Sequence, residues 1–319
     1  MNGKYSVGVA VVTYKDKRHL EKCLPPLLKS PLKPKVIVFN SSSNDGTVEE
    51  AKRLGAETLV IPREEMNHGW AREISRKMLG TDIVVMMTPD AYAADEHMLE
   101  KLVEPIISGK AAISYARQIP HPGANIVSAF SRKYNYPEES NIRSIEDVPK
   151  YGVYTAFCSD TCTAWLNSAL DEVGGFRWVL SGEDAVAAAM ILKKGYKIAY
   201  TAEAVVYHSH NYGPIKEFSR HFDTGMYRRQ WHKVLDLGGD GDQDRGWSYA
   251  GALLSYVARN KPGMLPTAFA QMATGWLGYK LGWLCYHRAP DWFYRKISPA
   301  DFFWNSKGYK EGRWFDPAE

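Results

Sequence analysis

Asp90 stands at the end of an apolar stretch, where a carboxylate needs a partner. It follows the run Asp82–Met87, which reads DIVVMM and is typical of a buried strand. Burying a carboxylate is costly unless it is paired or binds a cation, so Asp90 is suited to a divalent ion that bridges two phosphate oxygens. The alternative is that Asp90 caps a helix running from Glu96 onward.

A second set of candidate metal ligands is a histidine pair. His208 and His210 flank a serine at the end of an apolar run. Lone histidines are more often structural than metal ligands, but two of them at a strand end favour a metal site. The separation of Asp184 from His208 fits a helix followed by a returning strand, so both side chains can reach one cleft.

Glu183 and Asp184 are adjacent acids at the predicted start of a helix that continues through Ala187–Ala189. Acids at a helix N-terminus satisfy its free N–H groups and its dipole, which is the structural interpretation. The functional interpretation is that one carboxylate faces a cleft as a general base while the other is anchored in the cap.

Asn40 opens a polar loop directly after the apolar run Lys35–Phe39. Its amide both donates and accepts hydrogen bonds, so it can pair with the edge of a pyrimidine base. A polar turn that caps the next helix, through Asp45 or Thr47, is the competing interpretation.

The elements that must position these residues alternate between strand and helix. The sequence predicts strands at Val7–Thr13, Lys35–Phe39, Thr58–Ile61 and Asp82–Met87, and helices at Arg18–Leu28, Thr47–Leu54 and Trp70–Leu79. This alternation from residue 5 to about 116 indicates a parallel sheet covered by helices. Ligands of such sheets bind beyond the carboxyl ends of the strands.

The second half of the chain is less regular. Residues Arg117–Tyr151 are predicted to be a long irregular connection. Its first part, Arg117–Pro137, contains Arg, His, Tyr and Asn side chains that suit hydrogen bonding and stacking on sugars. Helices are expected at Thr161–Val173 and Glu183–Lys194, and strands at Lys197–Thr201 and Ala204–Tyr207. We therefore predict one α/β domain over residues 1–230 and a helical, aromatic-rich extension over residues 231–319.

Composition excludes several classes of protein. The 319 residues are 45% hydrophobic and 24% charged, which is typical of a globular chain, and the net charge of +4 suits anionic ligands or an anionic membrane but is too weak to imply nucleic acid. The start of the chain resembles no secretory signal, and the longest apolar tract, Met264–Cys285, is interrupted by Pro266, Gln271 and Lys280. We therefore expect a cytoplasmic protein whose four cysteines are reduced.

Hydrolase elbows, P-loops and GxGxxG motifs are absent from the sequence.

Several short motifs occur in a recognisable order. They are Asn67–Arg72, Thr88–Ala91, Ala116–Ala124, Phe130–Pro137, Gly182–Asp184, His208–Asn211 and Arg220–Gly225. Together they resemble the inverting glycosyltransferase family 2, which has the GT-A fold, and more narrowly its bacterial rhamnosyltransferase branch. The similarity runs from about Val7 to Tyr227.

The resemblance implies a role for individual residues. Asp184 takes the position of the catalytic base, Asp90 that of the metal-binding acid and His208 that of a further metal ligand. Thr13 and Asn40 would line the nucleoside pocket, and Arg72 would lie near the diphosphate or donor sugar. Acceptor binding is expected from a further set of side chains: Arg117, Gln118, Arg132, Asn135, Tyr136 and Glu183.

Two positions depart from the pattern of the family. Asn40 replaces the more usual Asp, and Thr88 replaces the first acid of the DxD motif. With fewer protein carboxylates, the metal shell must be completed by donor phosphates and water. The resemblance implies Mn²⁺ or Mg²⁺ as cofactor, dTDP-L-rhamnose as donor, and a polysaccharide or lipid-linked oligosaccharide as acceptor.

Two other functions remain open on the sequence. One is a UDP-hexose transferase of the same fold, and the other is a non-catalytic subunit that binds sugar nucleotides. A base and a metal-binding acid, Asp184 and Asp90, favour an enzyme because binding alone requires no base. A nucleotide-sugar pyrophosphorylase is disfavoured, since its glycine-rich N-terminal loop is absent.

The C-terminal extension carries an aromatic row. Trp276, Tyr279, Trp283 and Tyr286 recur at steps of three or four residues, near cations that include Lys280 and Arg288. Such a face suits the surface of the inner membrane, where a lipid-linked acceptor would be found. The alternatives are packing against the catalytic domain or against a second copy in a homo-oligomer.

Overall fold

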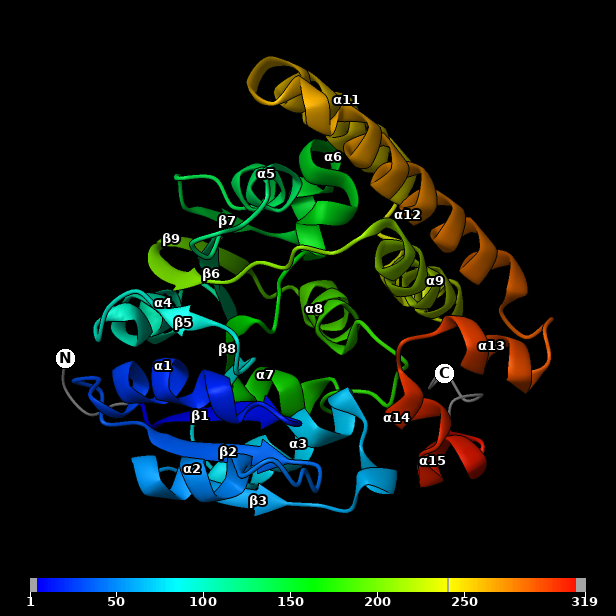
Figure 1. The fold of residues 1–319 in the computed structure, drawn as a ribbon. Helices are drawn as coiled ribbons and strands as arrows, with labels where there is room; N and C mark the ends of the chain where they lie inside the picture. Colours follow the sequence, from blue (N-terminus) through cyan, green and yellow to red (C-terminus); the bar gives the residue numbers. More distant parts are fainter. Residues whose placement is uncertain (1–4, 240, 314–319) are drawn as a thin grey trace.

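The computed structural model describes residues 5–239 and 241–313. Within them nine strands form one sheet in the order β3-β2-β1-β4-β8-β6-β9-β5, with β7 paired to β9 (Figure 1). The strands are β1 (Val7–Thr13), β2 (Lys35–Asn40), β3 (Glu57–Val60), β4 (Ile83–Met87), β5 (Tyr92–Ala93), β6 (Ile113–Ile119), β7 (Asn141–Arg143), β8 (Cys162–Leu166) and β9 (Ile198–Tyr207).

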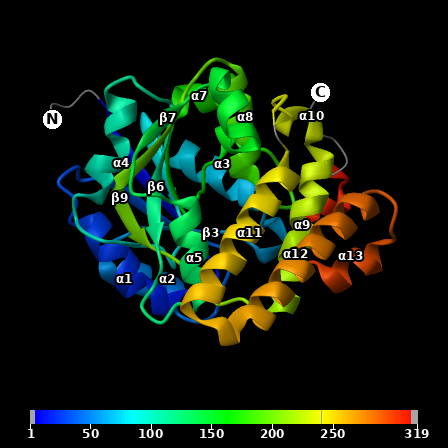
Figure 2. The same ribbon diagram turned by 90° about the horizontal axis from the view of Figure 1, so that it is seen from above.

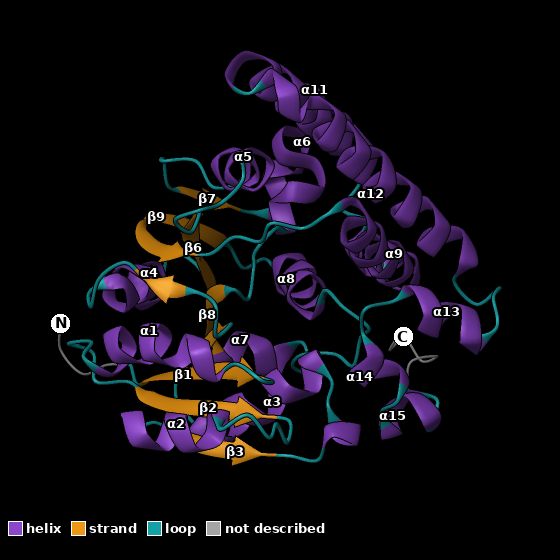
Figure 3. Cartoon of the chain, in the orientation of Figure 1, coloured by secondary structure: helices purple, strands orange, loops and turns teal. Residues whose placement is uncertain are grey.

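Helices cover both faces of this sheet (Figures 1 and 3). The helices of the first 230 residues are α1 (Lys17–Leu28), α2 (Thr47–Leu54), α3 (His68–Leu79), α4 (Met98–Ile107), α5 (Ile126–Asn135), α6 (Val148–Tyr151), α7 (Asn167–Glu172), α8 (Glu183–Lys193) and α9 (Pro214–Gln230). Those that follow are α10 (His232–Leu235), α11 (Asp242–Asn260), α12 (Leu265–Cys285), α13 (Asp291–Ile297), α14 (Asp301–Trp304) and α15 (Lys307–Lys310).

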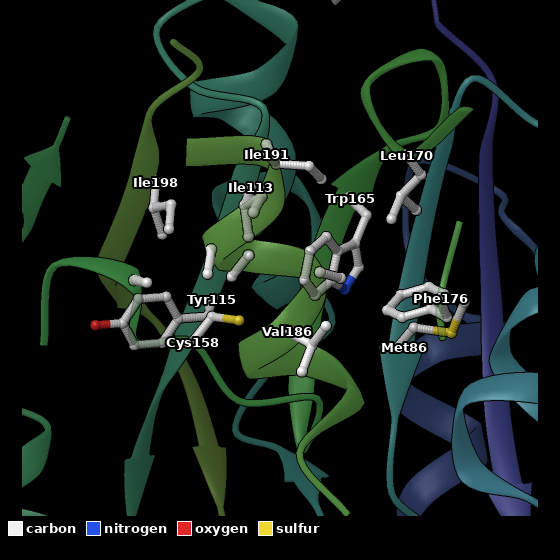
Figure 4. Packing of buried hydrophobic residues seen from close by; sticks show 14 of the residues in the cluster. Met86, Ile113, Tyr115, Cys158, Trp165, Leu170, Phe176, Val186, Ile191 and Ile198 are labelled. Carbon is white, nitrogen blue, oxygen red and sulfur yellow. The ribbon is translucent and has the colours of Figure 1, made fainter. Parts of the chain in front are cut away.

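Strand β4 shows why an apolar run without alternation becomes a central strand. Ile83, Val85 and Met87 pack with α1 and α4 on one face, whereas Val84 and Met86 pack with α7 and α8 on the other. Successive side chains of a strand point to opposite faces, so a strand buried on both sides must be apolar throughout. Figure 4 shows Met86 on the second face, near Phe176 of that core cluster.

The directions of the strands bring the expected site residues to one edge. Strands β1, β2, β3 and β4 are mutually parallel, β8 runs antiparallel to β4 and β6, and β9 runs parallel to β6. The carboxyl ends of β1, β2, β4, β6 and β9 therefore meet at the edge where β8 begins. Ligands bind at this edge in open α/β sheets.

Two predictions about the middle of the chain are wrong. The predicted helix Thr161–Val173 is strand β8 followed by the short helix α7, because Cys162–Leu166 fill the sheet between β4 and β6. The predicted irregular connection Arg117–Tyr151 contains the end of β6, helices α5 and α6, and strand β7. The predicted strands Lys197–Thr201 and Ala204–Tyr207 form one continuous strand, β9.

The C-terminal residues are helical, as predicted, and two glycines bring α12 against α9 (Figure 2). A Cβ atom at Gly278 would lie 2.2 Å from the carbonyl oxygen of Phe218, and one at Gly282 would lie 2.0 Å from that of Phe222. Larger residues at these positions would force the two helices apart.

Other contacts also join the tail to the first 230 residues. Helix α11 packs on α5 through Tyr256 and Phe130, whose ring centroids are 5.0 Å apart. Near the C-terminus, the ring of Phe302 lies 4.9 Å from that of His68 at the start of α3. The boundary between residues 230 and 231 stays a prediction. In the part of the chain described here, no helix is both long and apolar enough to cross a bilayer.

Candidate active site

Three side chains with metal-ligating atoms converge beyond the ends of β4 and β9. The Oδ2 atom of Asp90 lies 3.5 Å from Nε2 of His208 and 3.4 Å from Nε2 of His210. One ligand atom from each residue falls within 4.8 Å of the others. Tyr212 stacks on the ring of His210 at a centroid distance of 4.7 Å and fixes its plane. One carboxylate and two imidazoles are a suitable donor set for a divalent ion.

The protonation of His208 is fixed by Gln118 at the end of β6. The guanidinium of Arg132, which can only donate, is hydrogen-bonded to Oε1 of Gln118, and the same oxygen lies 2.8 Å from Nδ1 of His208. Nδ1 must therefore carry the proton. In the neutral ring, the lone pair of Nε2 then faces the Asp90 carboxylate, and two acceptors face each other. A cation bound between the two acceptors would remove their repulsion. The hydrogen bond from Nδ1 of His208 to Gln118 is of the kind that orients metal-ligating histidines.

The electrostatics of the group agree with a cation site. Burial by itself would raise the pKa of Asp90, but the hydrogen bond and charge that His208 supplies when Nε2 is also protonated, together with the charge of a protonated His210, hold that pKa well below its ordinary value. Burial, with the charge of His208, lowers the pKa of His210 to about 4. At neutral pH the group thus presents an ionised carboxylate and an unprotonated His210.

Asp184 lies at the same edge, in the first turn of α8. The backbone N–H of Asp160 donates to its Oδ2 at 3.1 Å, and the N–H of Ala185 donates to its Oδ1 at 2.8 Å. Asp160 belongs to the loop that precedes β8, and the next residue, Thr161, accepts a backbone hydrogen bond from Thr88. The Asp184 carboxylate is therefore linked through one loop to the segment that carries Asp90.

A buried cluster surrounds the Asp184 carboxylate. Arg72 lies 2.6 Å from Asp160 and 2.5 Å from Glu183, and all three are nearly inaccessible to solvent. The guanidinium of Arg72 is thus the positive charge that offsets the carboxylates of Asp160, Glu183 and Asp184. Burial, followed by the negative charge of Glu183, raises the pKa of Asp184, and burial raises the pKa of Asp160 to about 8. A carboxylate whose pKa is raised toward neutrality is a better proton acceptor than a free aspartate.

The nucleoside side of the edge is built from β1 and β2. Asn40 donates to Thr13 Oγ1 at 3.0 Å and accepts from the N–H of Ser43 at 2.8 Å, so both predicted nucleoside residues are buried and engaged within the loop. Next to them, the guanidinium of Arg63 lies 3.6 Å from the ring centroid of Tyr14 and donates to Ser41 at 2.7 Å.

Comparison with known proteins identifies the family. The family model described as Glycosyl transferase family 2 matches residues 8–174. The chain is also 34% identical over 284 residues to the O-antigen chain rhamnosyltransferase RfbN of Salmonella typhimurium, covering 88% of this chain and 89% of the relative. The chain belongs to glycosyl transferase family 2. A second relative, the O-antigen chain rhamnosyltransferase WbaN of Salmonella anatum, is 34% identical over 285 residues, which are 87% of this chain and 88% of that one.

Solved structures agree on the fold of this family 2 glycosyltransferase. A mannosyltransferase from Pyrobaculum calidifontis, in complex with GDP-Man and Mn²⁺, has a TM-score of 0.58 at 18% identity and covers 99% of this chain and 89% of its own. Residues 1–349 of TarS from S. aureus give a TM-score of 0.53 at 14% identity, covering 96% and 92%. The predicted α/β GT-A fold with a C-terminal helical extension is confirmed.

Several residues of this glycosyltransferase that were predicted to contact the donor or the acceptor have partners within the protein instead. Arg72, expected near the diphosphate, forms ion pairs with Asp160 and Glu183 instead. Of the predicted acceptor residues, Gln118, Tyr136 and Glu183 are buried. The other predicted acceptor residues are half-buried, and each has a protein partner: Arg117 with Glu138, Arg132 with Gln118, and Asn135 with Arg245. Direct contact with an acceptor stays a prediction for all six residues named from the sequence: Arg117, Gln118, Arg132, Asn135, Tyr136 and Glu183.

Sequence reasoning missed several residues of the site. His210 belongs to the histidine pair named from the sequence, but the family resemblance gave a metal role to His208 alone, and His210 approaches Asp90 as closely as His208 does. His121, whose Nε2 lies 3.0 Å from the backbone oxygen of Asp90, and Asp160 were not identified. The alternation of histidine and serine at 208–210 was a usable signal, because alternate residues of an extended segment point the same way. Asp160 gave none, since it stands one residue before a segment that was predicted to be a helix.

Proposed function

We propose that this glycosyltransferase moves L-rhamnose from dTDP-L-rhamnose to a hydroxyl of a cell-surface polysaccharide precursor, with inversion at the anomeric carbon. The observation that carries the proposal is the placement of an Asp184 carboxylate of raised pKa at the sheet edge that also holds Asp90, His208 and His210. The rhamnose donor is supported by the two O-antigen rhamnosyltransferases that match most of the chain.

In this proposal, Asp90, His208 and His210 would hold Mn²⁺ or Mg²⁺ together with the phosphates of the donor. The bound ion supplies positive charge to the departing diphosphate. Asp184 accepts the proton of the acceptor hydroxyl as the oxygen attacks the anomeric carbon from the face opposite to the diphosphate. The N–H groups of Asp160 and Ala185 keep the carboxylate oriented for that transfer.

The surrounding residues then have supporting roles. Arg72 keeps Asp160 and Glu183 in place and limits the negative charge around Asp184, rather than touching the diphosphate itself. We assign contact with the nucleotide to Arg63, because its half-buried guanidinium lies on Tyr14 and has an ordered donor beside Ser41. Asn40 and Thr13 shape that loop from behind.

We further propose that the acceptor is carried on a lipid at the cytoplasmic face of the inner membrane, and that the enzyme associates with this surface. The net charge of +4 and the apolar residues exposed on α12 support such contact. A homo-oligomer that covers the same face is the competing arrangement.

A panel of nucleotide sugars tests the donor. We expect dTDP-L-rhamnose with Mn²⁺ to raise the melting temperature of the protein, because a ligand that binds only the native state stabilises it. UDP-hexoses with the same ion should do so less. A larger rise in melting temperature with a UDP-hexose would overturn the rhamnose assignment and identify the chain as a UDP-hexose transferase. Protection without turnover on any acceptor would favour a binding subunit.

A further inference from the structure

A second cationic site lies away from the catalytic edge. A cavity of about 830 Å³ is enclosed by the C-terminal half of α8, the end of α9, α10 and the last turn of α12. Lys193 lies about 13 Å further along α8 than Asp184, at the rise of an α-helix. The cavity is therefore separate from the groups that were assigned to transfer.

Positive charge without counter-charge distinguishes this cavity. Its lining includes five Arg or Lys side chains: Arg177, Lys193, Arg229, Lys233 and Arg288. Among its described lining residues there is no aspartate or glutamate, and no carboxylate of the described chain forms an ion pair with any of the five. Within the described residues, the side chains of Lys193 and Arg177 donate hydrogen bonds only to backbone oxygens, those of Lys233 and Val173. Such a cluster repels itself unless an anion enters it.

Trp231 lines the same cavity and has an unusual buried N–H group. The residue is 3% exposed, and its indole Nε1–H has no hydrogen-bond acceptor among the described residues. Leaving a buried donor without an acceptor is unfavourable, so native structures rarely do so. Since this N–H is closed to solvent, an anionic oxygen would reach it only after the indole turned toward the cavity, and the cations are the groups that an anion meets first.

The exterior of α12 shows what kind of molecule brings that anion. Gly278 and Gly282 face α9, so the opposite side of the helix is open, and it exposes Phe269, Trp276, Leu277 and Leu284. Leu284 also lines the cavity, and Trp292 of α13 is 64% exposed nearby in the chain. Of the predicted aromatic row, Trp283 and Tyr286 instead line the cavity, and Arg229 lies 5.3 Å from the Trp283 ring centroid.

We infer that this cavity binds the phosphate of an anionic phospholipid, and that it docks the enzyme on the membrane with the apolar side of α12 against the lipid. The cations take the phosphate, while the exposed Trp, Phe and Leu side chains enter the interface. A free phosphate would use the cations but would leave the adjacent apolar row unexplained. The inference deepens the proposed membrane association and is independent of the donor sugar.

Vesicle flotation tests the site. Wild type should float with vesicles of equal parts phosphatidylcholine and phosphatidylglycerol, and not with phosphatidylcholine alone. Lys233→Gln with Arg288→Gln should weaken binding about 25-fold, at about 5-fold for each cation lost near an anionic surface. The matched control is Lys194→Gln with Lys197→Gln, which removes equal charge from exposed side chains outside the lining of the cavity. We expect the control to bind nearly as wild type does.

Inorganic phosphate separates the lipid from a soluble anion. At constant ionic strength it should raise the melting temperature of wild type, and less so that of Lys233→Gln with Arg288→Gln. Stabilisation by phosphate without any vesicle binding would overturn the lipid assignment. Equal loss of binding in the cavity variant and in its control would mean diffuse attraction and would overturn the site. Transfer to a soluble acceptor, measured on the same variants, should be unchanged, so failure of the docking site is distinguished from failure of the proposed transfer.

Discussion

Replacing Gln118 by Leu should weaken metal binding without touching a metal ligand. Gln118 is 2% exposed, and its Oε1 accepts from both Arg132 and Nδ1 of His208. Leucine is shorter by one heavy atom and has no acceptor. The ring of His208 would lose the partner that keeps the proton on Nδ1 and directs Nε2 toward Asp90.

The size of the effect follows from two separate costs. Removing the partner that orients a metal-bound histidine lowers metal affinity about 10- to 100-fold. The Nδ1–H of His208 and the guanidinium of Arg132 would also be left buried with one acceptor fewer, which costs about 1–3 kcal/mol of folding stability for each such group. Both effects should appear, and the first is specific to the metal.

The measurement is a Mn²⁺ titration by calorimetry, together with thermal unfolding of the metal-free protein. Gln118→Glu is the control, because it keeps an acceptor oxygen for both partners and should retain wild-type affinity or exceed it. If Gln118→Leu is folded and binds Mn²⁺ as tightly as wild type does, the tautomer argument fails, and His208 is no metal ligand.

Asp184→Asn should lower turnover by about 10²- to 10⁴-fold, the range of a lost general base, with donor affinity near wild type; retention of a tenth of the activity would remove Asp184 from that role. Alanine at Asp90, His208 or His210 should each weaken Mn²⁺-dependent donor binding, and full wild-type activity in excess chelator would overturn the metal assignment. Because the pKa of Asp184 is raised, kcat/KM should fall as the pH falls through a value above the usual aspartate range of about 4, and a flat acid limb would contradict this. Burial raises the pKa of Asp160 to about 8, so its proton stabilises the native state at low pH and this contribution declines as the pH rises from about 4 to about 8. Asp160→Asn should flatten that decline in unfolding measurements, and an unchanged slope would place the proton elsewhere in the cluster.

Local sequence determined the first half of the fold. Runs such as Val7–Thr13 and Ile83–Met87 are apolar on both faces, and a segment of that length and composition is stable only inside a covered sheet. The order of these strands with intervening helices then dictated parallel pairing and gathered their carboxyl ends. Asp90 could therefore be placed at the ligand-binding edge, and the histidines at 208 and 210 could be suspected of joining it.

The second half could not be predicted in the same way. Cys162–Leu166 is a strand because a gap between β4 and β6 must be filled, and no periodicity in five residues distinguishes such a strand from a buried helix. That error hid Asp160, whose backbone N–H holds the Asp184 carboxylate.

Only the tertiary structure decided what each polar side chain faces. From the sequence, Arg72 was predicted to bind the diphosphate or donor sugar. In the structure, its guanidinium lies among the carboxylates of Asp160, Glu183 and Asp184. Gln118 is similarly occupied by His208 and Arg132. Residue type and spacing establish which chemistry a side chain can perform. Which partner it meets depends on contacts between segments about a hundred residues apart, and these exist only once the sheet has closed and excluded water from the charges.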